Sequence, residues 1–187
     1  MNALMALPFG LSVLAPAVSQ SAAQHDRLCA GLGLAGLHGS SPDVGIAGYS
    51  LGGGMGWLAR RHGLQANSVT AIELVTAEGE LLRADAERHP DLFWALRGGG
   101  GNFGVVTAIE FAVYPVAELY AGAMFFPLER AGEVLHAWND LLPSLPVELM
   151  SWVSLLRFPD LPMVPAPMRG RAFAVLIAAH LGDEPGG

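Results

Sequence analysis

Apolar residues alternate with polar or small ones along several short stretches, and this pattern predicts β-strands. Ser68 to Thr76 and Glu80 to Ala84 are rich in β-forming side chains, and the short turn between them predicts a hairpin. Val105 to Tyr114 is a longer alternating run and predicts a strand that ends before a proline. The apolar run Asp43 to Ala47 is also expected to be a strand.

Helical patterns occur between these strands. Trp57 to His62 is expected to form two helical turns, ended by Gly63 in a left-handed conformation. Asp91 to Arg97 is expected to form a second helix, because Pro90 is favourable at a helix start.

The second half of the chain repeats this mixture of elements. Apolar residues from Ala131 to Leu142 recur with helical spacing, and Pro143 ends the helix. Glu148 to Arg157 and Arg171 to His180 are predicted strands. A boundary near Val116 is expected to separate this half from the preceding one.

Composition indicates a folded protein and excludes some classes of partner. The chain has 187 residues, of which 52% are hydrophobic and 14% charged, so a sizeable buried core is expected. The net charge of −7 offers no attraction for nucleic acids or acidic membranes. The single cysteine, Cys29, excludes an intramolecular disulfide, and no Cys/His cluster has the spacing of a metal site.

The N-terminal segment has no assigned role. Ala3 to Val18 is largely apolar, but prolines and a glycine interrupt it, so it is too broken to span a bilayer. No Lys or Arg precedes Arg27, so the positive region of a secretion signal is missing. We therefore expect a cytoplasmic protein without a membrane segment.

The candidate ligand-binding segments are two glycine-rich runs, Gly48 to Gly56 and Gly98 to Gly104. Glycines cost conformational entropy and are used where the backbone needs positive φ or a close approach to a ligand. Such loops expose backbone N–H groups that can surround an anion such as a diphosphate. The alternative for each run is a tight turn between layers of the fold.

Three motifs compete within these runs. Gly48-Tyr49-Ser50-Leu51-Gly52 matches the G-x-S-x-G nucleophile elbow, which would make Ser50 the nucleophile of a serine hydrolase. The only late His–acid pair for such a triad is His180 with Asp183, which lies too close to the end of the chain. Gly54 to Ala59 and Gly99 to Gly104 each match a dinucleotide fingerprint, although a strand rather than a helix follows the second.

The residues resemble a known family at this point. Gly36 to Gly54, Gly56 to Leu64 and Pro90 to Gly98 with the following glycines are similar to FAD-linked oxidases of the vanillyl-alcohol-oxidase type, in the berberine-bridge-enzyme-like branch. The similarity runs from about Gly36 to Val116 and is looser beyond. It implies the second half of a PCMH-type FAD-binding domain, followed by the start of an α+β substrate domain.

The resemblance also implies how FAD would lie. The first glycine run would pass along the diphosphate, with the helix from Trp57 offering its positive end. It assigns no catalytic residue. The implied FAD-binding residues are Gly48, Tyr49, Leu51, Gly52, Gly53, Gly54, Gly56, Trp57, His62, Gly63, Val105 and Val106.

The resemblance further divides the chain into an unassigned segment 1–35, part of an FAD-binding domain at 36–116, and an incomplete substrate domain at 117–187. The family's histidine-bearing loop is not recognisable in Met1 to Ala35, so bound FAD is expected to be non-covalent. The implied reaction transfers a hydride from an alcohol, amine or sugar carbon to flavin and then electrons to oxygen. A non-catalytic scaffold is a third possibility.

The strands from Val44, Ser68 and Val105 are expected to share a sheet whose other members lie in upstream sequence of the relatives. An incomplete sheet exposes an unpaired edge and an apolar face, so self-association is expected.

Overall fold

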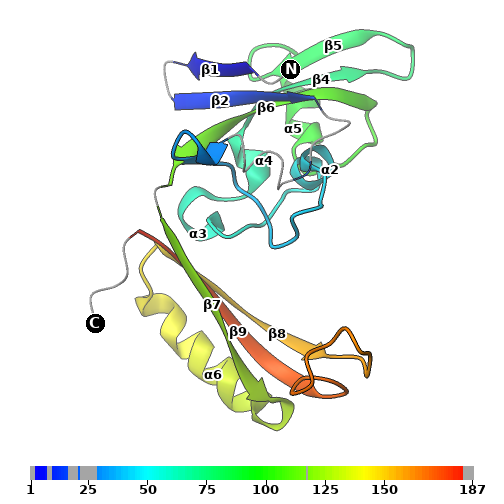
Figure 1. Ribbon diagram of the computed structural model, residues 1–187. Helices are drawn as coiled ribbons and strands as arrows, with labels where there is room; N and C mark the ends of the chain where they lie inside the picture. The colour runs from blue at the N-terminus through cyan, green and yellow to red at the C-terminus, as the bar shows by residue number, and fades with distance from the viewer. Residues whose placement is uncertain (1–2, 8–9, 17–20, 22–28, 117, 183–187) are drawn as a thin grey trace. The chain divides into compact units, whose positions relative to one another are not determined.

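The structure is a computed structural model that describes residues 3–7, 10–16, 21, 29–116 and 118–182. The chain divides into two compact units, Met1–Ala117 and Glu118–Gly187. Each unit contains an antiparallel sheet and helices of its own (Figure 1).

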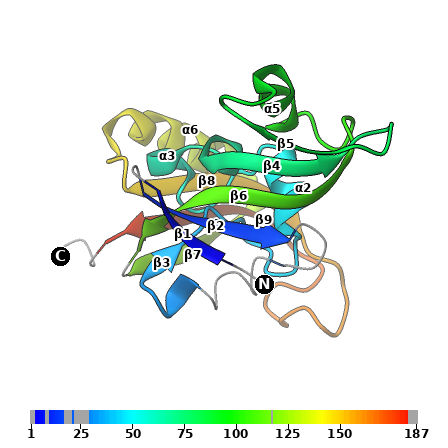
Figure 2. The ribbon, with the colours of Figure 1, turned by 90° about the horizontal axis from the view of Figure 1, so that it is seen from above.

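The sheet of the first unit has the strand order β1-β2-β6-β4-β5, and every neighbouring pair is antiparallel. Figure 2 shows these strands side by side from above. The short β3 (Leu34–Ala35) pairs with the end of β6. The five strands of the main order are β1 (Ala3–Leu7), β2 (Gly10–Pro16), β4 (Val69–Val75), β5 (Leu81–Asp85) and β6 (Val105–Pro115).

These strands confirm the predicted hairpin and the predicted long strand, but they correct the expectation of an incomplete sheet. The predicted hairpin is present as β4 and β5, joined through Gly79 with φ of 83°, and β6 follows the predicted span. The N-terminal segment, which had no assigned role, supplies β1 and β2. Because β2 pairs with β6 along Leu11–Pro16, strands of this chain occupy a sheet edge that we expected upstream sequence to fill.

The core of the first unit lies between the sheet and the helices α2 (Ile46–Leu51) and α5 (Pro90–Leu96), which Figure 1 shows on one side of the sheet. Large side chains of β4 and β6 point into it because alternate residues of a strand share a face. Burial of such side chains is the main stabilising contribution. The central members are Ile46, Leu51, Ile72, Leu74, Phe93, Leu96, Ile109 and Phe111.

The expected strand over Asp43 to Ala47 is wrong, because α2 begins at Ile46. Ile46, Ser50 and Leu51 are its buried residues, and this spacing is that of one helical face. Val44, before the helix, is 42% exposed. A short run of apolar residues does not distinguish a strand from one buried helical turn, and the tertiary contacts decide.

The remaining helices of the first unit are short. The helix α3 (Ala59–His62) has a single turn and α4 (Gln65–Ser68) another, whereas two turns were predicted from Trp57. The predicted helix after Pro90 is confirmed as α5, and Gly98 follows it with φ of 126°.

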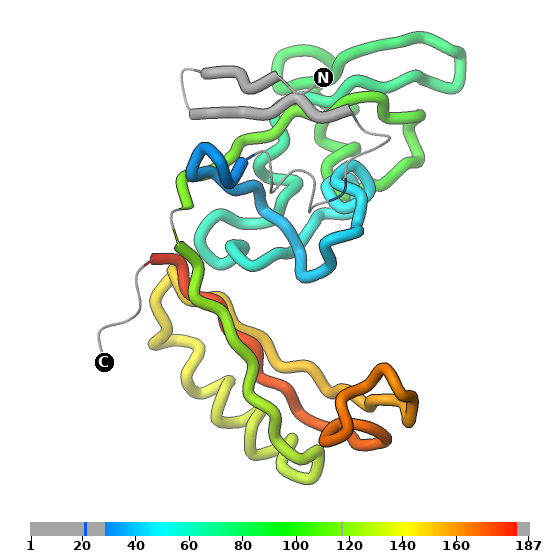
Figure 3. The backbone as a smooth tube through the Cα atoms, in the orientation of Figure 1, coloured from blue at the N-terminus to red at the C-terminus, as the bar shows by residue number. Residues whose placement is uncertain are grey.

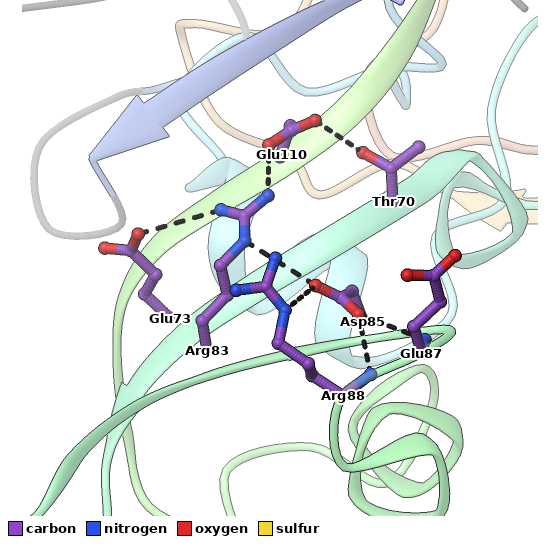
Figure 4. Close-up of polar contacts among 7 residues, drawn as sticks. All are labelled: Thr70, Glu73, Arg83, Asp85, Glu87, Arg88 and Glu110. Atoms are coloured by element: carbon purple, nitrogen blue, oxygen red, sulfur yellow. Dashed lines mark hydrogen bonds and ion pairs between the residues drawn. The ribbon is translucent and has the colours of Figure 1, made fainter.

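Polar residues on β4, β5 and β6 form a charged cluster (Figure 4). Glu110 is only 4% exposed, and its carboxylate accepts hydrogen bonds from Arg83 at 2.7 Å and Thr70 at 3.2 Å. Glu73 and Asp85 each lie 3.7 Å from the Arg83 guanidinium. Arg83 thus balances a buried carboxylate, and its hydrogen bond to Glu110 raises the pKa of the guanidinium further.

The second unit has a three-stranded sheet with the order β7-β9-β8, formed by β7 (Leu119–Pro127), β8 (Leu149–Arg157) and β9 (Ala172–Leu181). Figure 3 shows α6 (Ala131–Leu141) running alongside these strands. The short 3₁₀ turns Leu128–Arg130 and Leu142–Ser144 flank α6. The predicted helix and both predicted strands of this half are confirmed.

Two kinds of feature are absent from the described residues. No helix among them is long and apolar enough to cross a membrane. No group of three or more His, Cys, Asp or Glu side chains in the same residues could hold a metal ion.

Candidate functional site

The first glycine run leaves α2 and turns sharply. The N–H of Gly52 donates to the carbonyl of Gly48 at 3.1 Å, and the N–H of Gly53 donates to Ser50 at 3.2 Å, which ends the helix. Gly53 then has φ of 104° and Gly54 has φ of 73°. Side chains with a Cβ rarely adopt these values, so glycine is required here for the turn itself.

The protein's own packing gives Gly54 and Gly56 a second reason to be glycine. A Cβ on Gly54 would lie 2.7 Å from both Gln65 Cβ and Tyr49 Cε1. A Cβ on Gly56 would lie 2.0 Å from the carbonyl oxygen of His38. Gly54 therefore leaves room for the side chains of Gln65 and Tyr49, and Gly56 lets the backbone at His38 approach.

The same segment is anchored through its carbonyl groups, which leaves several N–H groups available. The N–H groups of Gln65 and Ala66 donate to the carbonyls of Gly54 and Gly53, at 2.8 and 2.9 Å. Within the described residues, no hydrogen-bond partner is found for the N–H groups of Gly54, Met55 and Gly56. Three successive backbone donors of this kind can bind an anion.

A pocket of about 230 Å³ lies beside this segment. Its walls are formed by loop residues before α2, by Ile46 and Tyr49 of α2, and by Met55 of the glycine run. Because Trp57 donates its N–H to the His38 carbonyl at 3.1 Å, the loop before α2 is held against the glycine run. The lining residues are His38, Gly39, Ser40, Ser41, Val44, Ile46, Tyr49 and Met55.

Burial changes the pKa of two titratable side chains in the pocket. Burial lowers the pKa of His38 to about 4, so its imidazole is neutral at pH 7. Burial also raises the pKa of Tyr49 to about 12. The hydroxyl of Tyr49 is buried without a hydrogen-bond partner among the described residues, which is costly unless a ligand or water supplies one.

The structure excludes the nucleophile-elbow interpretation of Ser50. Ser50 is 1% exposed, lies within α2, and donates its Oγ hydrogen to the Ile46 carbonyl at 2.8 Å. A nucleophile elbow needs an exposed Oγ on a sharp turn after a strand. His180, from the suggested triad, belongs to the second unit, and Asp183 lies outside the described residues. The serine hydrolase hypothesis is therefore wrong.

The helix that was expected to present a positive end is too short for that role. The α3 helix begins at Ala59 rather than Trp57, and the Ala59 N–H already donates to Gly56. A single turn carries little of the dipole of a long helix. His62, at its end, stacks on Tyr114 with ring centroids 4.0 Å apart, and Gly63 has φ of 80°.

The second glycine run meets the first through one hydrogen bond, from the Gly100 N–H to the Leu51 carbonyl at 3.0 Å. Gly104 has φ of 146°, and a Cβ there would lie 2.4 Å from the Val75 carbonyl. Val105, which pairs with Val75 at the start of β6, is 68% exposed, whereas Val106 is 9% exposed and belongs to the core.

The structure therefore brings together only some of the predicted FAD-binding residues. Tyr49 lines the pocket, and Gly53, Gly54, Gly56 and Trp57 form the segment beside it. His62, Val105 and Val106 are not among the pocket residues. The prediction omitted His38, Ser40, Ser41 and Met55, although the first three belong to the Gly36–Gly54 stretch that carries the family resemblance.

Comparisons with known proteins relate part of the chain to FAD-binding proteins. A sequence family described as an FAD binding domain matches residues 17–85. (R)-6-hydroxynicotine oxidase from Paenarthrobacter nicotinovorans is 44% identical over 113 residues, which cover 60% of this chain and 25% of the relative. Xylooligosaccharide oxidase from Thermothelomyces thermophilus is 37% identical over 105 residues, which cover 56% of this chain and 21% of the relative.

The chain carries a match to an FAD binding domain over residues 17–85 and is similar to FAD-linked oxidoreductases. The matched FAD binding domain, together with relatives named as FAD-linked oxidoreductases, supports FAD as the cofactor. The chain spans about a quarter or less of the length of these two curated relatives.

Solved structures extend the similarity to the fold of almost the whole chain. The crystal structure of 6-hydroxy-D-nicotine oxidase from Arthrobacter nicotinovorans has a TM-score of 0.78 and 26% identity, covering 97% of this chain and 39% of that one. Berberine bridge enzyme from Eschscholzia californica has a TM-score of 0.75 at 23% identity, covering 97% of this chain and 35% of that one, and shows the fold alone. The expected α+β class, with part of a PCMH-type FAD-binding domain, is confirmed.

Proposed function

We propose that the segment from Gly53 to Trp57 and the adjoining pocket bind the diphosphate part of FAD, in a chain that belongs to an FAD-dependent oxidase. The observation that carries this proposal is the run of three backbone N–H groups, at Gly54, Met55 and Gly56, without a partner among the described residues. Backbone N–H groups at a glycine turn bind phosphate oxygens in many nucleotide sites.

The side chains around the segment fit such a ligand. The buried Tyr49 hydroxyl lacks a partner in the described chain and can donate to a ligand oxygen. Ser40 and Ser41 add hydroxyl groups to the pocket wall, and His38 is neutral at pH 7. The pocket thus offers donors without a fixed negative charge, which suits an anionic group.

Bound FAD supplies a two-electron acceptor for a hydride from a substrate carbon. The relatives are named as oxidases of 6-hydroxynicotine and of xylooligosaccharides. We therefore propose that the substrate is a small molecule that contains an oxidisable amine, alcohol or sugar carbon, and that oxygen accepts the electrons. The role of this chain's own residues is to hold and orient the cofactor.

The test is FAD binding by a matched pair of glycine variants. Gly53→Val places a β-branched side chain at φ of 104°, which such residues do not adopt, so the turn and FAD retention should be lost. Gly132→Ala is the control, because a Cβ there meets nothing within 4 Å and Gly132 lies within α6 of the second unit. Binding is measured by the quenching of FAD fluorescence on titration with protein.

Tyr49→Phe refines the test because it removes only the hydroxyl. If that hydroxyl donates to FAD, affinity should fall by roughly twofold to tenfold while the unfolding temperature stays the same or rises. Equal affinity of wild type and Gly53→Val for FAD would refute the site.

We also propose that the cofactor is held non-covalently and that the protein works in the cytoplasm. Acid precipitation of the loaded protein should release all flavin into the supernatant, and flavin that stays with the denatured chain would contradict this. Cell fractionation of tagged protein tests the compartment.

A further inference from the structure

The outer strand β7 of the second unit has a strand neighbour on one side only. The sheet order is β7-β9-β8, so β9 lies on one side of β7, and no described strand pairs with its other side (Figure 1). The register between β7 and β9 is continuous from Leu119 to Pro127, without a bulge. A regular edge of this length is a template for pairing with another strand.

The ladder between β7 and β9 shows which backbone groups of β7 face outward. The N–H of Gly182 donates to the Glu118 carbonyl at 3.3 Å, next to the pair of Leu119 with Leu181. Hydrogen-bonded pairs alternate along an antiparallel ladder, so the even-numbered residues of β7 bond to β9. The residues that direct their backbone groups away from β9 are therefore Leu119, Ala121, Ala123, Phe125 and Pro127.

The side chains of β7 lack the charges that protect other sheet edges. No residue of β7 is charged, whereas the edge strand β5 of the first unit carries Arg83 and Asp85. Tyr120, Met124 and Phe125 are apolar or aromatic and are 58%, 53% and 47% exposed. Charged side chains on an edge strand oppose pairing with another strand. In a chain with a net charge of −7, this neutral edge is a place where two copies can approach without repulsion between facing charges.

The position of Ala123 makes β7 suitable for pairing with itself. Ala123 is the middle residue of the nine in β7, so two copies that run antiparallel about Ala123 overlap along the whole strand. Ala123 is also one of the outward-facing residues. The register with complete overlap therefore brings the outward N–H and carbonyl groups of both copies opposite each other.

The side chains fit each other in the same register. Ala121 lies opposite Phe125 of the second copy, and Gly122 lies opposite Met124 of the second copy, so small residues face large ones. Tyr120 lies opposite Phe126 of the second copy, which is a favourable cross-strand aromatic pair. Because the axis is twofold, each of these contacts occurs twice.

We propose that β7 is a dimerisation edge, at which the β7 strands of two copies pair antiparallel about Ala123. The pairing joins the two three-stranded sheets into one continuous sheet. The occupant of the edge is a second copy of this chain, because β7 supplies both the small and the large residues of the fit. No residue of the proposed FAD site takes part, and pairing does not require FAD.

Cysteine cross-linking tests the register. In Ala123→Cys, the two new thiols face each other across the twofold axis, where Cα atoms are about 5.5 Å apart and a disulfide can form. Ala121→Cys is the matched control, because Ala121 is also an exposed alanine whose backbone groups face outward. Its counterpart lies four residues along the strand, about 13 Å away, which no disulfide spans. Both variants are made in a Cys29→Ala background, because Cys29 is a free thiol.

Under mild oxidation, we expect at least ten times more disulfide-linked dimer from Ala123→Cys than from Ala121→Cys. Ala121→Cys mixed with Phe125→Cys should also cross-link, because these two positions face each other in the proposed register. Equal cross-linking of Ala123→Cys and Ala121→Cys would overturn the proposal. Dimers in which Ala123→Cys does not cross-link would place the interface elsewhere on the protein.

A backbone variant tests the hydrogen bonds of the edge. Ala123→Pro removes an outward N–H without removing a bond to β9, and edge strands tolerate proline at such positions. Ala123→Thr is the control, because threonine keeps the N–H and favours strands. Sedimentation equilibrium should give a dimer Kd at least tenfold higher for Ala123→Pro than for wild type and Ala123→Thr, and circular dichroism verifies that each is folded. A wild type that stays monomeric up to about 200 μM, or an unchanged Kd in folded Ala123→Pro, would refute the dimerisation edge.

Discussion

Gly56→Ala is the sharpest test of how the candidate site is built, because it adds one methyl group at the closest backbone approach around the pocket. The new Cβ would lie 2.0 Å from the His38 carbonyl oxygen, 2.6 Å from its carbon and 2.9 Å from the Tyr49 hydroxyl. Contacts below about 3 Å do not occur for real Cβ atoms, so the backbone near His38 or Gly56 must move.

The magnitude follows from what that movement disrupts. The N–H of Trp57 donates to the same His38 carbonyl at 3.1 Å, so a shift of either segment lengthens or breaks this bond. A lost hydrogen bond costs about 1 kcal/mol and overpacking a further 1–3 kcal/mol. We therefore expect the free energy of unfolding to fall by about 3 kcal/mol, which corresponds to a lower unfolding temperature by roughly 10 °C.

Gly48→Ala is the matched comparison, since it adds the same methyl group inside α2 with nothing within 4 Å. Replacing a helical glycine by alanine stabilises by about 0.5–1 kcal/mol, so the unfolding temperature should rise by a few degrees. The assay is thermal unfolding followed by circular dichroism, without added FAD. An unfolding temperature of Gly56→Ala within 2 °C of wild type would refute the reasoning, with the 2 °C taken as about half a kcal/mol.

Three other predictions concern pH, charge and association. Burial lowers the pKa of His38 to about 4, so between pH 6.5 and 4 the unfolded chain binds a proton that the folded chain does not. The free energy of unfolding should therefore fall by at most about 3 kcal/mol as the pH drops through this range. In urea titrations at several pH values, His38→Gln should show a smaller fall than wild type. Glu110→Gln should lower the free energy of unfolding by about 1–2 kcal/mol, because Arg83 loses its buried partner but, at 31% exposure, can be partly rehydrated. Glu133→Gln, which breaks the exposed pair with Arg130, is the control and should leave the urea midpoint unchanged. We expect concentration-dependent self-association through β7, which is an edge strand of its sheet. Phe125→Lys places a charge at a 47% exposed apolar position of that strand and should shift the masses measured by light scattering toward the monomer. An unchanged mass distribution would show that β7 is not in the interface.

The sequence by itself determined those elements whose signals are local. The hairpin of β4 and β5, the long strand β6, and the helices α5 and α6 follow from alternation, helical spacing and the positions of Gly79, Pro90 and Gly98. Each of these elements was predicted from residues that are adjacent in the sequence. The resemblance to FAD-linked oxidases likewise rests on contiguous motifs, and the matched FAD binding domain agrees with it.

Tertiary structure decided what depends on distant neighbours. Asp43 to Ala47 did not become a strand because Ile46 is buried in the first turn of α2, whereas Val44, before the helix, is exposed. Ser50 matches a nucleophile motif, yet its position inside that helix buries the hydroxyl. Gly56 must be glycine because the His38 carbonyl approaches it from another segment. Such approaches are set by packing between segments, and a local pattern of residues does not encode them.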